Sequence, residues 1–515
     1  MKAFFVSITS QITLNYLSML EGVLFLLAGV LGYWIAFRAQ LSGQLNRALA
    51  FLLLMGLLLR IYGASEFFLH PWDERYHALV AKNFLNHPMI PTLYDRPLLP
   101  FEPGHFTNAH IWLSKPPLPL WAMSVSIACF GTGNELLLRL PSILVSVASI
   151  WLTYKIASAL FDQRVAFMAA FLHSIHGLLI ESTAGRVSSD VVDTFFIFFV
   201  ELAVYSVIIS NNKPRQAVWV VLCGVFTGLA FLSKWYPALL VWPLWLGYTI
   251  HRRQFSAGPI IGRGILLVMA TLVVALPWYI WIRLQFPGEF ADLLEGLQQP
   301  IRQVVQEHTG PPWYYLDQIR MTFGELIYLP VLWFLVQGIR RPFPKRTLIN
   351  LWFLIPLVIF SAATTKRPTY QLVFAPALFI ISAEFILLLY ANRARLKPVF
   401  LFQLILVLLI ALPVRYSLER LKPFQSKDRK PEWAMALKQL GGTVGANTVL
   451  LNYKAPVEAM YYTGMVAYEA LPSPDTIRML QNRGFSIMIQ DDGLLPETAA
   501  HLSGVRYIRL PAPNW

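Results

Sequence analysis

Charged residues are scarce in this chain. Asp, Glu, Lys and Arg make up 14% of its 515 residues, whereas a typical soluble domain carries about 25%. Hydrophobic residues reach 56%, and many of them fall in runs of about 20, the length that crosses a bilayer as a helix. The composition therefore excludes an ordinary soluble protein and predicts a polytopic α-helical membrane protein.

Cysteine is nearly absent as well. The two cysteines, Cys129 and Cys223, lie in apolar stretches, which excludes a disulfide framework and a cysteine metal site. The chain also lacks HExxH, CxxC and P-loop motifs, so zinc hydrolysis and nucleotide hydrolysis have no support. At the N-terminus no short apolar core precedes a small-residue cleavage site. We therefore expect the first apolar run to be kept as a membrane span.

The basic residues indicate how the spans are oriented. The net charge is +14, but the basic residues form short clusters between apolar runs, which is typical of membrane proteins and predicts no nucleic-acid partner. We expect about twelve or thirteen spans, at 17–37, 49–65, 137–160, 164–183, 190–210, 216–233, 236–250, 261–283, 321–338, 347–364, 370–391 and 397–416. The positive-inside rule assigns to the cytoplasm the connections that hold Arg38 and Arg47, Lys155 and Arg164, Lys213 and Arg215, Arg252, Arg253 and Arg263, Arg340, Arg341, Lys345 and Arg346, and Arg393, Arg395 and Lys397.

The other connections should then face outward. They are the loops 66–136 and 284–320, the connections 184–189 and 365–369, and everything after about 417. We expect the short apolar segment 118–130, which begins with prolines, to be an interfacial or re-entrant helix rather than a span. The expected localisation is the inner (cytoplasmic) membrane, with the polar motifs and the C-terminal domain on the periplasmic or outer face.

The composition changes near residue 420, which predicts two domains at 1–420 and 421–515. After a basic linker, short β-type runs near 448–452, 485–489 and 505–509 alternate with amphipathic stretches near 431–440, 456–463, 473–482 and 495–502. Such alternation predicts a small α/β domain. It has no glycine signature for phosphate binding, and acceptor docking is the one role we consider for it.

An acidic motif opens the first outer loop. Asp73, Glu74 and Arg75 follow the second apolar run, and a carboxylate at the mouth of a membrane span is costly to desolvate. We interpret Asp73 as a catalytic carboxylate, although the pattern also fits a helix N-cap followed by a helix to about 86. Glu74 and Arg75 would bind substrate or simply be solvated charges.

A second acidic motif stands before a later span. Asp190 and Asp193 are one helical turn apart, and Arg186 precedes them. The helix dipole favours carboxylates at such a position, which offers a structural explanation. We nevertheless expect Asp190 to be catalytic, with Arg186 and Asp193 near the substrate.

Cations lie at several outer membrane edges. Lys115 and Lys366 are each followed closely by proline, Tyr370 comes shortly after the second of them, and Arg302 and His308 lie in loop 284–320. Fixed cations beside an apolar groove suit a phosphate whose tail lies in lipid. Snorkelling lysines are the structural alternative.

The order of these motifs resembles that of GT-C membrane glycosyltransferases, in the group of protein O-mannosyltransferases and lipid A aminoarabinose transferases. The resemblance covers about 65–420 and rests on Asp73-Glu74-Arg75-Tyr76, Lys115-Pro116-Pro117-Leu118, Gly131-x-x-Asn134-Glu135-x-x-x-Arg139-Leu140-Pro141, Arg186-x-x-x-Asp190 and Lys366-x-Pro368-x-Tyr370. It implies transfer of one sugar from a polyprenyl-phosphate donor to a lipid, glycan or protein acceptor, with inversion at the anomeric carbon.

The resemblance also implies residue roles. Asp73 matches the first-loop catalytic aspartate and Asp190 the second external aspartate, while Lys115, Arg302 and Tyr370 match donor-phosphate ligands, a task that Lys366 would share. Ser114 stands where the aminoarabinose enzymes commonly have Glu, and glutamines, Gln298 and Gln299, stand near the position of a metal-binding histidine. Both departures weaken the case for a bound zinc. No cofactor or metal is required, because the cations can stabilise the leaving phosphate, and a divalent metal stays open without support.

Two other functions remain open from the sequence. An oligosaccharyltransferase or glycan ligase would use the paired acids with a metal. A transporter or flippase for a lipid-linked sugar would use the intramembrane acids Glu201 and Glu384 as pathway residues.

Overall fold

The computed structural model describes residues 2–100, 109–188, 190–210, 216–252, 257–395, 397–500 and 502–513. The predicted cytoplasmic residues Lys213, Arg215 and Arg253 lie outside these ranges, as do parts of the predicted outer segments at 101–108 and 189.

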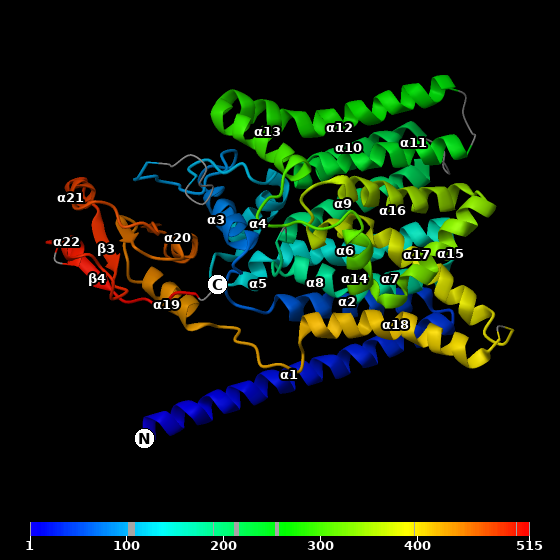
Figure 1. Cartoon of the computed structure of the whole chain (residues 1–515), viewed down its shortest axis with the longest axis horizontal. Coiled ribbons are helices and arrows are strands. Elements are labelled where there is room, and N and C mark those ends of the chain that lie inside the picture. The colour runs from blue at the N-terminus through cyan, green and yellow to red at the C-terminus, as the bar shows by residue number, and fades with distance from the viewer. Residues whose placement is uncertain are drawn as a thin grey trace. The chain divides into compact units, whose positions relative to one another are not determined.

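The chain divides into two compact units. We call residues 1–64, 142–184 and 189–427 the helical unit, and residues 65–141, 185–188 and 428–515 the mixed unit. The predicted first outer loop thus groups with the C-terminal residues, so the compact units do not follow the sequence-based division at residue 420. Figure 1 labels the elements of both units.

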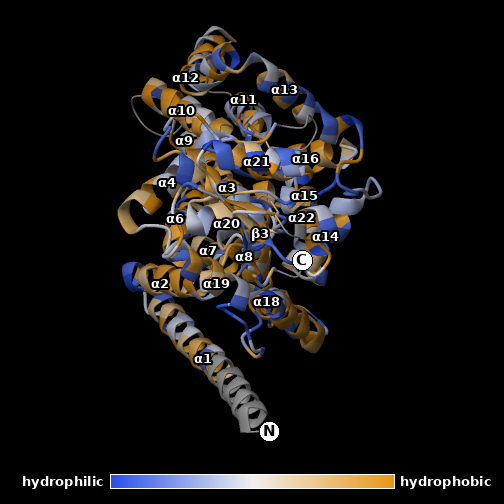
Figure 2. Ribbon diagram, turned by 90° about the vertical axis from the view of Figure 1, so that its left-hand side faces the viewer, coloured by the Kyte–Doolittle hydropathy of each residue, from blue (hydrophilic) through white to orange (hydrophobic). Residues whose placement is uncertain are grey.

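Most helices of the helical unit are apolar. Its elements are α1 (Lys2–Leu41), α2 (Leu45–Ala64), α6 (Leu140–Leu160), α7 (Gln163–Ser174), α8 (Gly177–Thr183), α9 (Asp190–Ser210), α10 (Gln216–Lys234), η2 (Tyr236–Leu240), α11 (Val241–His251), α12 (Ala257–Gln285), α13 (Pro287–Arg302), α14 (Tyr314–Phe323), η3 (Glu325–Ile327), α15 (Tyr328–Arg340), α16 (Pro344–Ala362), η4 (Pro368–Phe374), α17 (Ala375–Ala391) and α18 (Val399–Leu421). Figure 2 shows α2 and α10 largely in the hydrophobic colour, whereas α13 is largely hydrophilic. Helix α10 packs between α9 and α12 (Figure 1).

The described residues contain nine helices long and apolar enough to cross a membrane, or up to eleven if each of two bent pairs is one span. The prediction of a polytopic helical membrane protein is therefore confirmed. The predicted span 164–183 is bent by 57° between α7 and α8, and 321–338 falls on a pair bent by 117° at Gly324, whose φ is +100°. The predicted span 236–250 consists of a 3-10 turn that carries a proline and an 11-residue helix.

The mixed unit combines the first loop with a parallel sheet. Its helices are α3 (Asp73–Asn83), α4 (Pro117–Phe130), α5 (Glu135–Leu138), α19 (Glu432–Gly441), α20 (Pro456–Thr463), α21 (Pro474–Asn482) and α22 (Glu497–Ala500). Its strands are β1 (Thr448–Leu451), β2 (Val466–Ala467), β3 (Ser486–Gln490) and β4 (Val505–Ile508).

The sheet has the order β2-β1-β3-β4, and all pairs are parallel. Every residue of β1 is buried, as expected for an inner strand that helices cover. The predicted α/β domain, with its three longer strands and four helices, is confirmed, and the two-residue strand β2 was not predicted.

Candidate functional site

Two predicted site residues meet at the start of helix α3. The ammonium of Lys115 lies 2.8 Å from a carboxylate oxygen of Asp73, and both side chains keep limited solvent access. Lys115 is held there because Pro116 is extended and Pro117 opens α4. Asp73 is the first residue of α3 and Trp72 is the N-cap, so the N-cap interpretation of Asp73 is wrong. The pair joins a carboxylate to a cation in a place that solvent reaches.

Glu74, the next residue of α3, is fully buried. Arg139 binds both of its oxygens, at 2.6 and 2.8 Å, and a ring nitrogen of His70 lies 2.6 Å from one of them. Burial alone would raise the pKa of the Glu74 carboxyl, but Arg139 and His70 overcome that effect and lower it to about 2. Glu74 is therefore an internal anion and not a solvated charge, while its predicted contact with substrate stays a prediction.

The network around Glu74 extends to Arg186. The other ring nitrogen of His70 lies 2.7 Å from Glu66, and the guanidinium of Arg186 lies 3.7 Å from the same carboxylate. Gly185, with φ +75°, packs so closely that a Cβ there would lie 2.4 Å from Glu74 Oε1. The Arg186 segment is thus bound to the helix that begins at Asp73.

Arg75, the next residue of α3, contacts a different set of side chains. Its guanidinium lies 3.2 Å from Glu458, whose side chain is fully buried, and 4.8 Å from the centre of the Tyr76 ring. This ion pair joins α3 to α20. Arg75 is therefore occupied by protein groups, contrary to its assignment as a solvated charge.

In the helical unit, Asp190 and Asp193 occupy the first turn of α9. Both are buried, with exposures of 0% and 2%, and the hydroxyl of Ser182 donates to the backbone carbonyl of Asp190. The ammonium of Lys234, the last residue of α10, donates to Asp193. It also lies 5.0 Å from the centre of the Tyr370 ring, so the structure brings Asp193 and Tyr370 to one cation.

Sequence reasoning did not single out Lys234. Its context, Ser233-Lys234-Trp235-Tyr236-Pro237, resembles those of Lys115 and Lys366, because a lysine ends an apolar run shortly before a proline. This pattern could have identified Lys234 as a further candidate cation. His70 and Glu458 were missed as well, Arg139 was named only as part of a motif and without a role, and only the fold reveals their partners.

The remaining predicted cations lie around the segment before η4. The backbone N–H of Lys366 donates to the carbonyl of His308 at 3.0 Å, and the Lys366 ammonium donates to the carbonyls of Ser361 and Ala363 at the end of α16. Burial, and then the charge of Arg367, lowers the pKa of His308. Arg302, the last residue of α13, is exposed.

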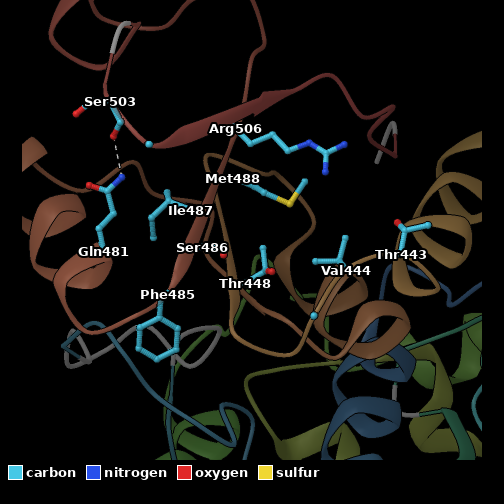
Figure 3. A pocket seen from close by; sticks show the side chains of 12 residues that line it. Thr443, Val444, Thr448, Gln481, Phe485, Ser486, Ile487, Met488, Ser503 and Arg506 are labelled. Atoms are coloured by element: carbon cyan, nitrogen blue, oxygen red, sulfur yellow. Dashed lines mark hydrogen bonds between the residues drawn. The ribbon is translucent and has the colours of Figure 1, made fainter.

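The described residues contain no group of three or more His, Cys, Asp or Glu side chains placed to hold a metal ion. A pocket of about 680 Å³ lies in the mixed unit and is lined by the starts of β1, β3 and β4 and by α21. Figure 3 shows Gln481, which donates to the Ser503 carbonyl, on one side of this pocket and Thr443 on the other. None of the predicted site residues lines it.

Comparison with known proteins gives a family match. Residues 114–281 match the family described as dolichyl-phosphate-mannose-protein mannosyltransferase. An undecaprenyl phosphate-alpha-4-amino-4-deoxy-L-arabinose arabinosyl transferase of Pseudomonas fluorescens is 30% identical over 275 residues, 52% of this chain and 47% of that protein. A Proteus mirabilis protein of the same description is 26% identical over 285 residues, 53% of this chain and 50% of that protein. The chain thus spans about half the length of the curated relatives it matches.

Solved structures share the fold over more of the chain. ArnT from Cupriavidus metallidurans, bound to undecaprenyl phosphate, superposes with a TM-score of 0.60 at 16% identity, covering 84% of this chain and 87% of that one. The oligosaccharyltransferase of Archaeoglobus fulgidus gives a TM-score of 0.54 at 12% identity, covering 84% and 68%. The resemblance that the motifs predicted is confirmed: this chain has a GT-C fold and is similar to the membrane glycosyltransferases of the protein mannosyltransferase and aminoarabinose transferase group.

Proposed function

We propose that this protein transfers one sugar from a polyprenyl-phosphate donor, of the undecaprenyl-phosphate kind, to a lipid, glycan or protein acceptor. The transfer takes place on the outer face of the inner membrane and inverts the anomeric carbon. The observation that carries the proposal is the pairing of Asp73 with Lys115 at 2.8 Å. It sets a proton acceptor next to a phosphate-binding cation.

The reaction breaks the bond between the anomeric carbon and a phosphate oxygen. An acceptor hydroxyl attacks the anomeric carbon, Asp73 takes the hydroxyl proton, and polyprenyl phosphate leaves with the bonding electrons. Lys115 stabilises the negative charge that develops on the leaving phosphate, which is often the largest part of catalysis. Arg302, Lys366 and Tyr370 have the same task in this proposal.

The other acidic residues have supporting roles. Asp190 is the second catalytic carboxylate, and its place at the start of α9 lets the helix dipole stabilise its charge. Asp193 holds Lys234, which we add to the phosphate-binding cations. His308 and Arg186 remain candidates for contacts with the donor or the acceptor. No step needs a metal.

The test is a transfer assay with purified protein and a radiolabelled undecaprenyl-phosphate sugar. We expect Asp73→Asn to abolish cleavage of the donor while donor binding persists, because the amide cannot accept the proton. Turnover by Asp73→Asn at the wild-type rate would exclude Asp73 as the base.

An oligosaccharyltransferase or glycan ligase is a second candidate function. The likeness to the Archaeoglobus fulgidus enzyme and the acids Asp190 and Asp193 favour it. Loss of activity on chelation, together with transfer of a whole glycan, would favour this alternative.

A transporter or flippase has less support. The intramembrane acid Glu201 accepts hydrogen bonds from Ser149 and Thr153, and Glu384 pairs with Arg346 at 2.8 Å. Both acids thus have protein partners. Movement of the labelled donor across vesicles without cleavage would be the result that favours a carrier.

A further inference from the structure

We propose that the C-terminal part of the mixed unit, residues 428–513, is a scaffold that positions helix α3 and its first residue, Asp73. Arg75 and Glu458 are the positioning residues of this scaffold. The inference rests on the proposed function, in which Asp73 acts on the acceptor, and it assigns to this part of the chain a role in the transfer reaction instead of acceptor docking.

The first contact lies one helical turn or less from Asp73. Arg75 lies 3.2 Å from Glu458, which lies in the first turn of α20 and has no solvent exposure. A buried carboxylate is costly unless it is paired. Glu458 therefore retains Arg75, and Arg75 fixes the first turn of α3.

The second contact lies at the other end of α3. The ammonium of Lys82 donates to the carbonyls of Met460 and Tyr461, at 3.0 and 2.6 Å. These carbonyls belong to the last turn of α20, where the helix dipole favours a cation. Helix α3 is thus held to α20 at both of its ends.

A third set of contacts holds the chain that leads into α3. The fully buried carboxylate of Glu135 binds Lys438 at 2.8 Å and accepts from the hydroxyl of Tyr462. The same hydroxyl accepts from the backbone N–H of Leu69, at 3.0 Å, and Lys438 also donates to the carbonyl of Phe67.

The loop after α3 is bound to the sheet. The rings of Tyr94 and Tyr468 are stacked with centres 5.0 Å apart, and the hydroxyl of Tyr94 donates to the carbonyl of Ala467 in β2. The C-terminal residues therefore contact the segments before, within and after α3. Because a catalytic group displaced by about 1 Å can lose about 100-fold in rate, these contacts bear on turnover.

The experiment compares Glu458→Gln with the wild type in the complete protein. Gln keeps the size of the side chain but cannot form the ion pair. We expect kcat to fall on the order of tenfold or more, with the donor KM nearly unchanged. We also expect faster hydrogen exchange of the α3 amides at 73–83.

The matched control is Asp491→Asn. Asp491 forms an exposed ion pair with Arg509 in the same unit, so this variant also removes an acidic partner but makes no contact with α3. Its kcat and its α3 exchange should equal those of the wild type. If Glu458→Gln does not fold, Lys82→Met serves as the second variant, because it removes the two bonds to α20 and keeps the apolar stem.

Unchanged kcat in both Glu458→Gln and Lys82→Met would overturn the scaffold, whatever the hydrogen exchange of α3. So would a loss in Asp491→Asn as large as that in Glu458→Gln, since the effect would then not depend on α3. Failure of the proposed function has a different signature: Asp73→Asn would turn over normally, while the α3 exchange of Glu458→Gln would still rise.

Discussion

Lys115 and Asp73 form an ion pair of 2.8 Å across 42 residues of chain, between the first residue of α3 and a residue that lies just before α4. In the proposed reaction both residues are needed, one for the leaving phosphate and one for the incoming hydroxyl. A phosphate that reaches Lys115 competes with Asp73 for the ammonium. In the proposed reaction, donor binding would therefore free the carboxylate to accept a proton from the acceptor.

We predict that Lys115→Met lowers transfer by at least about 100-fold, the scale reported for loss of one donor that stabilises transition-state charge. Lys115→Arg should keep more activity, because it retains the cation but alters its geometry. Donor binding and turnover, measured with labelled donor, check this. Equal activity of Lys115→Met and the wild type would contradict it.

The buried anion Glu74 predicts a pH dependence of stability. Its pKa is about 2 in the folded chain and 4.5 in its ordinary state. The stability it contributes is therefore fully present above pH 4.5 and is lost as the pH falls from 4.5 towards 2. The difference between these two pKa values corresponds to about 3 kcal/mol in the free energy of unfolding.

Thermal unfolding of the detergent-solubilised protein between pH 2.5 and 6 measures this effect. Glu74→Gln should unfold at a lower temperature near pH 6 and should lose most of the dependence on pH in this window. Asp475→Asn is the control, since its exposed pair with Arg478 contributes little. If the unfolding temperatures of Glu74→Gln and the wild type changed with pH in the same way, the ion pairs of Glu74 with Arg139 and His70 would not be the cause of the pH dependence.

We predict that replacing Gly185 with alanine lowers the stability of the fold. In Gly185→Ala the new Cβ would lie 2.4 Å from Glu74 Oε1, at a φ of +75° that disfavours any side chain. We expect a loss of about 1–3 kcal/mol, read as a lower unfolding temperature. Gly133→Ala, where a Cβ meets no atom within 4 Å, should leave the unfolding temperature almost unchanged.

We predict that Lys234 and Asp193 are coupled in their contributions to the stability of the fold. Lys234→Met leaves a buried carboxylate without its cation, which typically costs about 3–5 kcal/mol. The double variant Lys234→Met/Asp193→Asn should be more stable than Lys234→Met alone, because it buries no unpaired charge. Unfolding temperatures of the two single variants and the double variant give the coupling, and additive losses would show that the two side chains do not interact.

Much of the architecture could be predicted from local patterns. Long apolar runs predicted most of the spans, and the C-terminal alternation predicted β1, β3 and β4 with their helices, because both signals are contained in neighbouring residues. The short motifs at Asp73 and Lys115 could be found in the same way. Their order along the chain was enough to indicate the fold.

The sequence by itself thus determined the membrane class, the element types and the residues with reactive side chains. Only the tertiary structure decided which of those side chains are paired: Glu74 with Arg139, Arg75 with Glu458, and Asp193 with Lys234. The physical reason is that a charge becomes buried or exposed according to the distant segments packed on it, and 383 residues separate Arg75 from its partner. No periodicity within a helix or strand carries that information.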